Sequence, residues 1–494
     1  MLNAGKGKFE GGLTTRKYVE IAKVSRAIAF REIAVSRFNE VKNEDRDMLK
    51  QFIVIFCSVA VFNLAAEEEI VVRLATESSL EPLYMTQMRA SGSTLGDDYV
   101  QKMGDVLSYD LGHNGSTFVA KQDPAKDEMA SANNMGGQKG WKSQNIYYVV
   151  KPAIDGNTLS AYMFDVQNQS LKSSEKITLS GDPVQDRRSV HRLADTIHKA
   201  FFGKPGISST KVIFAVKNKA VDGVSEIWEV DYDGANPRQV TKEKTYNITP
   251  VYIPPKPGFV TGGFLYVSYK IGQPKIYAAS TKDTTGKRVV QMKGSQLMPA
   301  VSLQRDKIAF ISDVTGNPDL FIQNFSPETG AIGKPQQIFS ALQATQGSPC
   351  FSPDGNKVAF VSNKDGGPKI YVIDIPEAGT SLNNIKPTLI SRRNRENSAP
   401  AWSPDGTKLA FCARSSDDRQ IWIYDFATKQ ETQVTSGQGN KENPSWAPNS
   451  LHLVFNSADK DKDSQLYRIN LNQPEATQIT YNIGDKRFPN WEPR

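Results

Sequence analysis

The sequence is poor in the residues that build most enzyme and metal sites. It holds three cysteines and four histidines in 494 residues, and it contains no His-Glu-x-x-His, Cys-x-x-Cys or phosphate-binding glycine loop. His191 and His198 are seven residues apart, too far for the usual i, i+4 metal pair on a helix. The stretch 92–96 is Gly-Ser-Thr-Leu-Gly, which is not the Gly-x-Ser-x-Gly motif of hydrolases. We therefore predict no catalytic residue, no metal site and no cofactor.

A strongly basic surface is also lacking. The formal net charge is +7, but residues 1–66 carry 11 Lys/Arg against 7 Asp/Glu, which leaves 49 against 46 in the remainder. No basic stripe interleaved with aromatic residues is present. Nucleic acid is therefore not a predicted partner.

Long hydrophobic runs are missing as well. The apolar stretch Phe52–Leu64 has 13 residues, whereas about 20 are needed to span a bilayer. Lys50 precedes this stretch and Ala65 and Ala66 follow it, so residues 48–66 have the parts of a secretory signal peptide. We predict export to the periplasm without membrane insertion of the mature chain.

Residues 1–47 precede the predicted signal peptide and allow two interpretations. They form either an amphipathic targeting helix or an extension that results from a start placed upstream of Met48. We favour the second interpretation. The mature chain then begins near Glu67 and retains Cys350 and Cys412, for which two buried thiols are favoured over a disulfide, although export permits one.

What the sequence does contain is a repeat. Residues 348–360, SPCFSPDGNKVAF, recur as APAWSPDGTKLAF at 399–411 and less closely as NPSWAPNSLHLVF at 443–455. Each copy is marked by a proline that a large or branched apolar residue follows two positions later. Such copies about every 45–50 residues are typical of the four-stranded blades of a β-propeller. The marked pairs are Pro250/Tyr252, Pro299/Val301, Pro349/Phe351, Pro400/Trp402, Pro444/Trp446 and Pro489/Trp491.

The two ends of the array predict a closed ring. Residues 211–241 contain three strands of a blade but lack the proline-marked strand, and Phe488 to the C-terminus supplies only that strand. We predict that the last strand completes the first blade, which gives six blades and no open edge. An open β-sandwich would leave the split blade unexplained. The predicted fold is mainly β: a six-bladed propeller over 207–494, preceded by a small α/β domain.

The small α/β domain is predicted over 98–206. It has a helix ending at Gly112, a hairpin of 146–150 and 159–166, and a helix over 184–202 that Gly203 stops. The polar stretch 123–142 is predicted to be a loop. Residues 67–97 are predicted to be an N-terminal partner-binding segment, with a strand at 70–74 and irregular structure through Pro82; an ordinary edge strand is the alternative.

This order of parts resembles the TolB family, the periplasmic propeller proteins of the Tol–Pal envelope system. The resemblance covers about 67–494. It is carried by the two Ser-Pro-Asp-Gly repeats, by RLADTIHKAFFGKPG at the entry to the propeller and by the terminal RFPNW. Blades with Ser-Pro-Asp-Gly turns also occur in peptidase and cell-surface propellers, so the order of the parts is the more specific feature.

The resemblance implies a non-enzymatic scaffold that binds two partners and acts in outer-membrane integrity and cell division as a monomer. A TolA-like inner-membrane protein would bind the mature N-terminus, and a Pal-like, peptidoglycan-associated lipoprotein would bind the mouth of the propeller channel. The implied TolA segment is Glu69, Ile70, Val71, Val72, Arg73, Leu74, Ala75, Thr76, Glu77 and Ser78. The implied Pal-binding mouth is Tyr246, Asn247, Ser295, Gln296, Gln346, Gly347, Glu396, Asn397, Lys441 and Glu442.

Two blades depart from the pattern. The blade at Pro250 has Tyr-Ile-Pro-Pro-Lys-Pro-Gly in place of the turn, and the blade at Pro299 has Ser-Leu-Gln-Arg. An exported propeller enzyme, related to lyases or peptidases, and a ligand-binding propeller remain as alternatives. An acid–base cluster in the channel would favour the enzyme.

Overall fold

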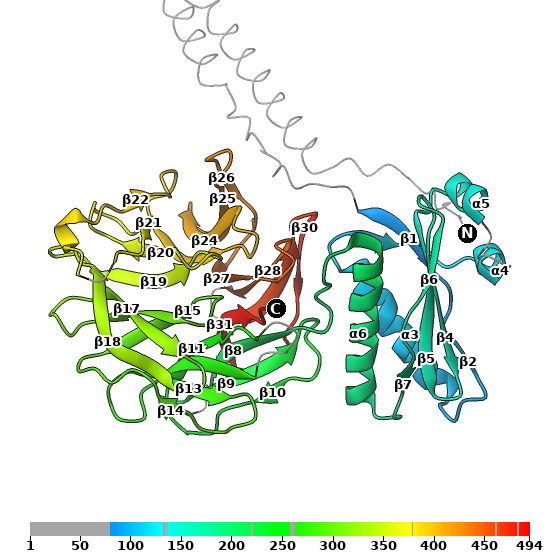
Figure 1. Cartoon of the computed structure of the whole chain (residues 1–494), viewed down its shortest axis with the longest axis horizontal. Helices are drawn as coiled ribbons and strands as arrows, with labels where there is room; N and C mark the ends of the chain where they lie inside the picture. The colour runs from blue at the N-terminus through cyan, green and yellow to red at the C-terminus, as the bar shows by residue number, and fades with distance from the viewer. Residues whose placement is uncertain are drawn as a thin grey trace, which may run out of the picture. The chain divides into compact units, whose positions relative to one another are not determined.

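The computed structural model describes residues 80–131, 135, 137–218, 221–256, 262–377, 379–459, 462–481 and 484–494. The predicted extension, the signal peptide and the TolA segment Glu69–Ser78 lie outside these residues. Among the described residues, no helix combines the length and the hydropathy that crossing a membrane requires. Figure 1 shows two described regions, a small α/β domain and a β-propeller.

The small domain is built on one mixed sheet with the strand order β3-β1-β4-β5-β6, in which β2 also pairs with β4 and β7 with β5. Its elements are β1 (Glu81–Met85), β2 (Arg89–Ser91), α3 (Asp97–Gly112), β3 (Thr117–Val119), α4 (Pro124–Ser131), α5 (Gly137–Ser143), β4 (Tyr148–Asp155), β5 (Thr158–Asp165), β6 (Ser170–Ser173), β7 (Ile177–Thr178) and α6 (Pro183–Phe202).

Helices cover both faces of this sheet. One hydrophobic cluster joins α3 and α6 to one face, through Leu107, Leu193 and Ile197, which are buried against Val150. The other face packs against α5 through the buried ring of Trp141, which lies 5.5 Å from the ring of Tyr84. The sheet is therefore the middle layer of the domain (Figure 1).

Two predictions for this domain are wrong. Residues 81–85 are neither irregular nor an edge strand, because β1 lies inside the sheet between β3 and β4 and the side chains of Leu83, Tyr84 and Met85 are buried. Residues 123–142 are not a plain loop, since they include α4 and α5. The buried indole of Trp141 anchors α5, and the hydroxyl of Tyr84 donates to Asp127 of α4.

The long helix before the propeller is confirmed. Asp182 caps α6 by accepting hydrogen bonds from the backbone N–H groups of Val184 and Gln185, and Pro183 occupies its first turn. Gly203 ends it in a left-handed conformation with φ of 69°. A helix that starts and stops at these residues places the chain at the entry to the first blade.

The propeller consists of six four-stranded antiparallel sheets within the described residues. Each sheet is written here from its innermost to its outermost strand. The blades are β31 (Asp485–Trp491), β8 (Lys211–Lys217), β9 (Ser225–Asp231), β10 (Arg238–Gln239); β11 (Asn247–Tyr252), β12 (Gly263–Ser268), β13 (Lys275–Ser280), β14 (Lys287–Arg288); β15 (Gln296–Val301), β16 (Lys307–Ser312), β17 (Asp319–Ser326), β18 (Gly330–Phe339); β19 (Gln346–Phe351), β20 (Lys357–Ser362), β21 (Lys369–Asp374), β22 (Thr388–Leu389); β23 (Asn397–Trp402), β24 (Lys408–Ser415), β25 (Asp418–Asp425), β26 (Glu431–Gln433); and β27 (Asn440–Trp446), β28 (His452–Ala458), β29 (Gln465–Asn470), β30 (Gln473–Gln478).

The C-terminal strand closes the ring, as the split blade predicted. β31 pairs with β8 in antiparallel register, with Trp491 opposite Val212 and Asp485 opposite Lys217. The indole of Trp491 is buried and donates to the hydroxyl of Thr210 at 2.8 Å. Closure therefore joins the last residues of the chain to the first propeller strand and pairs the inner edge of β8.

Equivalent aromatic side chains form the cores of the blades. At one equivalent position, the second strand of every blade carries an aromatic residue that is at most 1% exposed, a phenylalanine in five blades and Tyr266 in the other. Burying one such ring is worth roughly 1.5–3 kcal/mol relative to exposure. The repeat thus places an equivalent buried ring in all six blades, opposite an aromatic residue of the third strand: Phe214, Tyr266, Phe310, Phe360, Phe411 and Phe455.

The marker prolines occupy β-bulges. In every innermost strand the pairing register shifts across the marker proline and the residue before it, as between Gly347 and Cys350 around Pro349. A bulge removes the need for a backbone N–H, which proline lacks. The residue before each proline has a positive φ, between 45° and 55°: Thr249, Met298, Ser348, Ala399, Asn443 and Phe488.

Candidate functional site

The central channel is the first candidate site. It has a volume of about 470 Å³ and is lined by the six marker prolines and by the six positive-φ residues that precede them. Because the bulge turns these side chains toward the axis, the wall carries Met298 and Phe488 beside the small Ser348 and Ala399. The wall of the channel is mostly apolar, and its described lining residues include no cluster of acidic and basic side chains.

The strand order assigns every loop to one of two faces. In an antiparallel blade, the loops from the first to the second strand and from the third to the fourth lie on one face. The loops from the second to the third strand, and from the fourth to the next blade, lie on the opposite face. We call the first the turn face, since it carries the Ser-Pro-Asp-Gly turns, and the second the mouth face, since it carries the predicted Pal-binding residues.

Half of the predicted mouth residues are buried, and their polar ends are turned inward. These residues start the innermost strands: Asn247, Gln296, Gln346, Asn397 and Lys441 are at most 8% exposed. Gln296 donates to the carbonyl of Met292 at 2.7 Å and Asn397 to that of Asn394 at 3.0 Å. Lys441 donates to three carbonyls, those of Gly437 at 2.8 Å, Gly439 at 3.0 Å and Gln438.

These five residues are therefore not available to contact a partner directly. The side chains of Gln296, Asn397 and Lys441 donate to backbone carbonyls of the loops that enter their blades. Asn247 donates to the buried carboxylate of Glu226 at 3.0 Å and Gln346 to that of Asp319 at 3.4 Å. Lys486 repeats the arrangement in the closing strand, donating to Gly484 at 3.0 Å. We call the six side chains the inner polar ring: Asn247, Gln296, Gln346, Asn397, Lys441 and Lys486.

The other five predicted residues, Tyr246, Ser295, Gly347, Glu396 and Glu442, are half-buried at the mouth face. Two of them belong to a chain of ion pairs that crosses three blades. Glu396 pairs with Arg414 at 2.8 Å, and Arg419 lies between Glu396 at 3.8 Å and Glu442 at 3.1 Å. Arg487 of the closing strand lies 3.7 Å from Glu442 and 2.7 Å from Asp485. We call this chain the charged arc.

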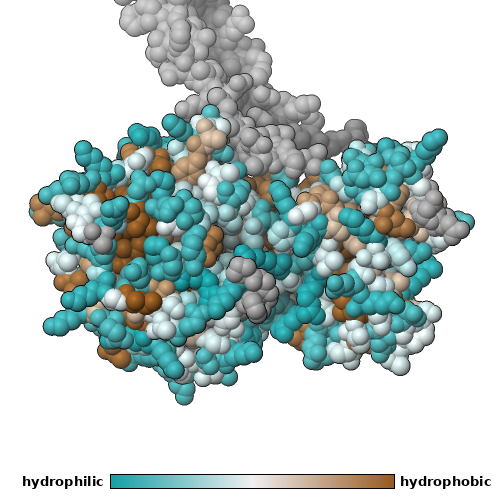
Figure 2. All heavy atoms as spheres, viewed as in Figure 1, coloured by the Kyte–Doolittle hydropathy of each residue, from teal (hydrophilic) through white to brown (hydrophobic). Residues whose placement is uncertain are grey.

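Exposed apolar side chains also gather on the loops of the mouth face. Eight large hydrophobic residues of the described propeller are exposed, and five of them lie on these loops, led by Leu342 at 91% and Tyr481 at 75%. Figure 2 shows a mainly hydrophilic surface interrupted by separate hydrophobic patches on the propeller. Exposed apolar residues beside paired charges are typical of a protein-binding face. The five are Val221, Ile271, Val314, Leu342 and Tyr481.

The turn face is covered in part by the small domain. Tyr232 donates to Asp110 of α3 at 2.6 Å, and Arg187 of α6 pairs with Asp233. His191 of α6 contacts Asp110 at 2.7 Å and lies 3.8 Å from Asp233. Ligand atoms of Asp110, His191 and Asp233 lie within 4.8 Å of one another. Both oxygens of Asp110 already accept hydrogen bonds, so these groups act as a link between the domains.

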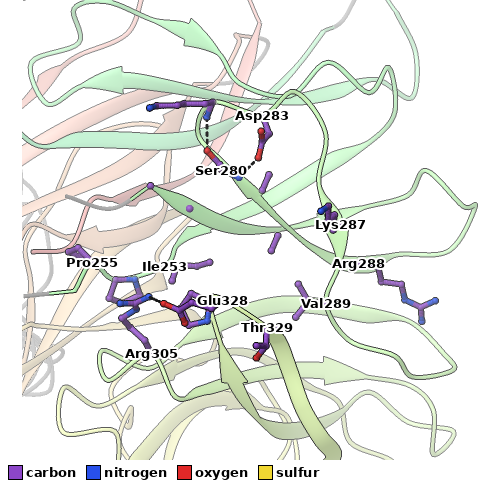
Figure 3. A pocket seen from close by; sticks show the side chains of 18 of the residues that line it. Ile253, Pro255, Ser280, Asp283, Lys287, Arg288, Val289, Arg305, Glu328 and Thr329 are labelled. Carbon is purple, nitrogen blue, oxygen red and sulfur yellow. Dashed lines mark hydrogen bonds and ion pairs between the residues drawn. The ribbon is translucent and has the colours of Figure 1, made fainter. Parts of the chain in front are cut away.

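A second hollow lies on the turn face beside the two blades that depart from the repeat. It has a volume of about 1230 Å³, and Figure 3 shows it between Ile253, Ser280 and Thr329. Three of its five lining cations already bind groups of the protein. Arg305 and Lys256 both contact Glu328 at 3.1 Å, and Arg288 donates to backbone carbonyls of Val290 and Met292. This hollow is therefore less suited to an anion than its lysines and arginines suggest.

The sequence analysis missed Arg414, Arg419 and Arg487 as members of the mouth face. Arg487 could have been predicted from the repeat, because it precedes Pro489 by two residues, as Glu442 precedes Pro444. Arg414 lies near the end of β24 and Arg419 near the start of β25, in a part of the repeat without a marker proline. The antiparallel pairing of these two strands places the two residues opposite each other.

Comparison with known families agrees with this architecture. The model of the TolB beta propeller domain matches residues 198–386 and 380–494, which is more than half of the chain. The chain belongs to the TolB family. A TolB homolog of Protochlamydia amoebophila is 58% identical over 403 residues, covering 80% of this chain and 86% of that protein. A TolB homolog of Chlamydia trachomatis is 36% identical over 386 residues, covering 76% and 80%.

A solved TolB structure shows the same fold. The crystal structure of TolB from Acinetobacter baumannii aligns with a TM-score of 0.67 at 20% identity, covering 85% of this chain and 98% of that one. TolB membership and this match confirm the predicted propeller with its small N-terminal domain.

Proposed function

We propose that this TolB-family chain is a non-enzymatic periplasmic scaffold of the Tol–Pal envelope system, which serves outer-membrane integrity and cell division. In this proposal the mouth face of the propeller binds a Pal-like lipoprotein. The segment Glu69–Ser78 binds a TolA-like inner-membrane protein, and the chain acts as a monomer. The observation that carries the proposal is the concentration of exposed apolar residues and the charged arc on one face.

The chemistry of the mouth face fits a folded protein better than a small molecule. Apolar side chains such as Leu342 and Tyr481 would lose contact with water on binding, and the rim of Glu396, Arg419 and Glu442 can exchange ion pairs with a partner. The inner polar ring holds the loops in place before binding, so little conformational entropy is lost when a partner docks.

The test is a calorimetric titration of the exported chain with a Pal-like lipoprotein domain from the same cell. We expect micromolar or tighter binding. Leu342→Asp with Tyr481→Asp should weaken it by at least tenfold, because it places two charges where apolar contact is expected. Arg419→Glu should weaken it further and reduce the loss of affinity that added salt causes, because an attractive charge is replaced by a repulsive one.

A matched control uses the turn face. Lys357 and Asp374 form an exposed ion pair there, comparable in exposure to Glu396 and Arg414 at the mouth. Lys357→Glu should leave binding unchanged. Equal losses from Lys357→Glu and from Arg419→Glu would show that the mouth face has no special role, and absence of any binding would remove the Pal partner.

The N-terminal partner needs a separate experiment. Deleting Glu69–Ser78 should abolish binding of a TolA-like periplasmic domain while the chain still binds the Pal-like domain. Retention of TolA binding by the truncated chain would refute the role proposed for this segment without affecting the mouth face.

A further inference from the structure

All four histidines of the chain lie where the small domain meets the propeller. His113 follows α3, His191 and His198 lie on α6, and His452 begins β28. His191, His198 and His452 are at most 4% exposed, and His113 is half-buried. Because histidine is the side chain that titrates near neutral pH, this placement makes the contact between the domains sensitive to protons.

His452 is the histidine of the propeller, and it packs directly against the small domain. A Cβ on Gly115 would lie 2.9 Å from its ring, so the glycine permits this close approach. Asn449, whose amide lies 3.0 Å from the Nδ1 atom of His452, also donates to the carbonyl of Asn114 in the small domain at 3.3 Å. Asn472 adds a second link between the domains by donating to Gly115 at 2.8 Å.

An arginine already occupies this part of the contact. Arg468 of β29 is 3% exposed and lies with its guanidinium 5.0 Å from the ring of Tyr232 and 5.6 Å from that of Tyr109. It also donates to the hydroxyl of Tyr109 at 3.0 Å. The ring of His113 stacks on Tyr109 at 4.0 Å, so His113 and His452 both face a fixed positive charge.

Three histidines are therefore held in the neutral form. Burial lowers the pKa of His113, and Arg468 lowers it further although the carbonyl of Tyr109 opposes the change. Burial and the charge of Lys204 lower the pKa of His198. Its hydrogen bond to the carbonyl of Lys204 and the charge of Asp195 act in the opposite direction but are weaker. Burial and Arg468 lower the pKa of His452 well below its usual value.

His191 behaves in the opposite way. Burial and the charge of Arg187 lower the pKa of His191. The hydrogen bond and charge of Asp110, together with the charge of Asp233, outweigh them, so the pKa of His191 is raised. Its Nε2 atom has no hydrogen-bond partner and lies 3.8 Å from Asp233. A protonated His191 can donate toward Asp110 of the small domain and Asp233 of the propeller together.

We propose that this contact is a proton-sensitive latch, which holds the small domain on the propeller near neutral pH and loosens when the pH falls below about 6.5. In the closed state His191 lies between Asp110, whose own pKa burial raises, and Asp233. His113 and His452 face Arg468, and His198 is buried between Ser116 and the carbonyl of Lys204. Protonation of His113 or His452 in acid adds a positive charge beside Arg468, and the closed contact cannot neutralise this charge.

The sign of the effect follows from proton linkage. Three histidines with lowered pKa stabilise the closed contact above the ordinary pKa of about 6.5, and this contribution is lost as the pH falls. His191, with its raised pKa, stabilises the contact at low pH, and that contribution is lost as the pH rises through its pKa in the closed state. The contact is therefore tightest near neutrality.

The first experiment is a nuclear magnetic resonance titration of the untagged whole chain with labelled histidine, which gives one signal for each of four rings. We expect three apparent pKa values below the ordinary range and one above it. Four signals that all titrate near pH 6.5 would overturn the proposal.

The second experiment measures hydrogen exchange at the contact, corrected for intrinsic rates, at pH 7.2 and pH 5.5. Amides of the turn 232–236 and of 113–117 should exchange about ten- to a hundredfold faster at the lower pH, because opening takes up protons. Amides of β20 serve as the internal control and should not change. Unchanged protection at 113–117 and 232–236 would overturn the latch.

Variants separate the latch from general acid sensitivity. His113→Gln with His452→Gln removes two titrating rings and should abolish most of the acid-induced exchange. If the double variant does not fold, His113→Gln alone should remove about one third of the logarithmic response, since it removes one of three rings. Undiminished acid-induced exchange in the variant that folds would show that these histidines are not responsible.

Discussion

The two faces of the propeller use charged groups in opposite ways. On the mouth face, Glu396 and Arg414 pair at the surface, where both side chains are more than 40% exposed. On the turn face, Asp110, His191 and Asp233 form their link almost without exposure, between the small domain and the propeller. These charged groups of the mouth face are exposed to water and can form ion pairs with a partner, whereas those of the turn-face link are buried in the contact between the domains.

This difference predicts which substitutions affect folding and which affect binding. Breaking a buried charged network leaves uncompensated groups and costs about 3–5 kcal/mol, whereas an exposed pair contributes about 0–1 kcal/mol. Substitutions in the inner polar ring should affect both folding and binding, because its side chains are buried and also support the loops of the mouth face.

Asp110→Ala should have the largest effect. It removes the acceptor of both His191 and Tyr232 and leaves two buried donors without partners. We expect a loss of about 3–5 kcal/mol in the free energy of unfolding, measured with urea at pH 7. Asp110→Asn keeps an acceptor and should lose less. A loss below 1 kcal/mol for Asp110→Ala would mean that this link is no stronger than the charged arc.

Glu492→Gln tests a buried carboxylate near the closing strand. Burial and the charge of Glu229 raise the pKa of Glu492 to about 7, and its carboxylate accepts the N–H of Lys211. A raised pKa makes the charged form costly, so the wild type gains stability as the pH falls from 8 toward 4.5. We expect the variant to be more stable at pH 8 by about 1–3 kcal/mol.

The measurement for Glu492→Gln is urea unfolding of both proteins at pH 8 and pH 5.5. The difference between them should shrink at the lower pH, where the wild-type carboxyl is protonated. A constant difference would mean that Glu492 titrates normally in the folded chain.

Lys441→Met tests whether a buried residue of the mouth face affects stability as strongly as a buried residue of the domain contact. The ammonium of Lys441 satisfies three carbonyls, and methionine keeps the length of the side chain without its donors. We expect a loss of about 1–3 kcal/mol, measured by thermal and urea unfolding, together with weaker binding of the Pal-like domain. A neutral result would show that water replaces the ammonium at these loops.

Glu396→Gln should have the smallest effect on folding. Its carboxylate is 44% exposed and contacts Arg414 and Arg419 at the surface. We expect the free energy of unfolding to change by less than about 0.5 kcal/mol. A loss above 1 kcal/mol in the same urea experiment would remove the distinction between the two faces.

The accuracy of the sequence analysis followed the repeat. Each blade offers another copy of the same pattern, so the prolines, the aromatic second strands and the closing strand around Trp491 were all predictable. The sequence placed the ten proposed mouth residues on loops that enter the innermost strands, but it did not show which of their side chains are buried. Asn397 and Glu396 are neighbours in the sequence, yet one is turned into the blade and the other toward water, because side chains alternate along a strand.

The small domain has no repeat, and its prediction was correspondingly less accurate. Residues 81–85 were expected outside the sheet, since the motif around Pro82 resembles irregular structure. Residues 124–131 form a helix although only Ala130 is buried there, which leaves no apolar periodicity to detect. These elements depend on contacts with distant parts of the chain, such as the hydrogen bond between Tyr84 and Asp127.

The sequence by itself determined the number of blades, the closure of the ring and the membership in the TolB family. These properties depend on local patterns that occur many times, and repetition makes them independent of any single contact. The tertiary structure alone decided which polar residues line the inner ring, how Arg414 and Arg419 reach Glu396, and that all four histidines meet at one contact. Such groupings join residues of different strands and blades, and their burial and charge arise only when the chain is folded.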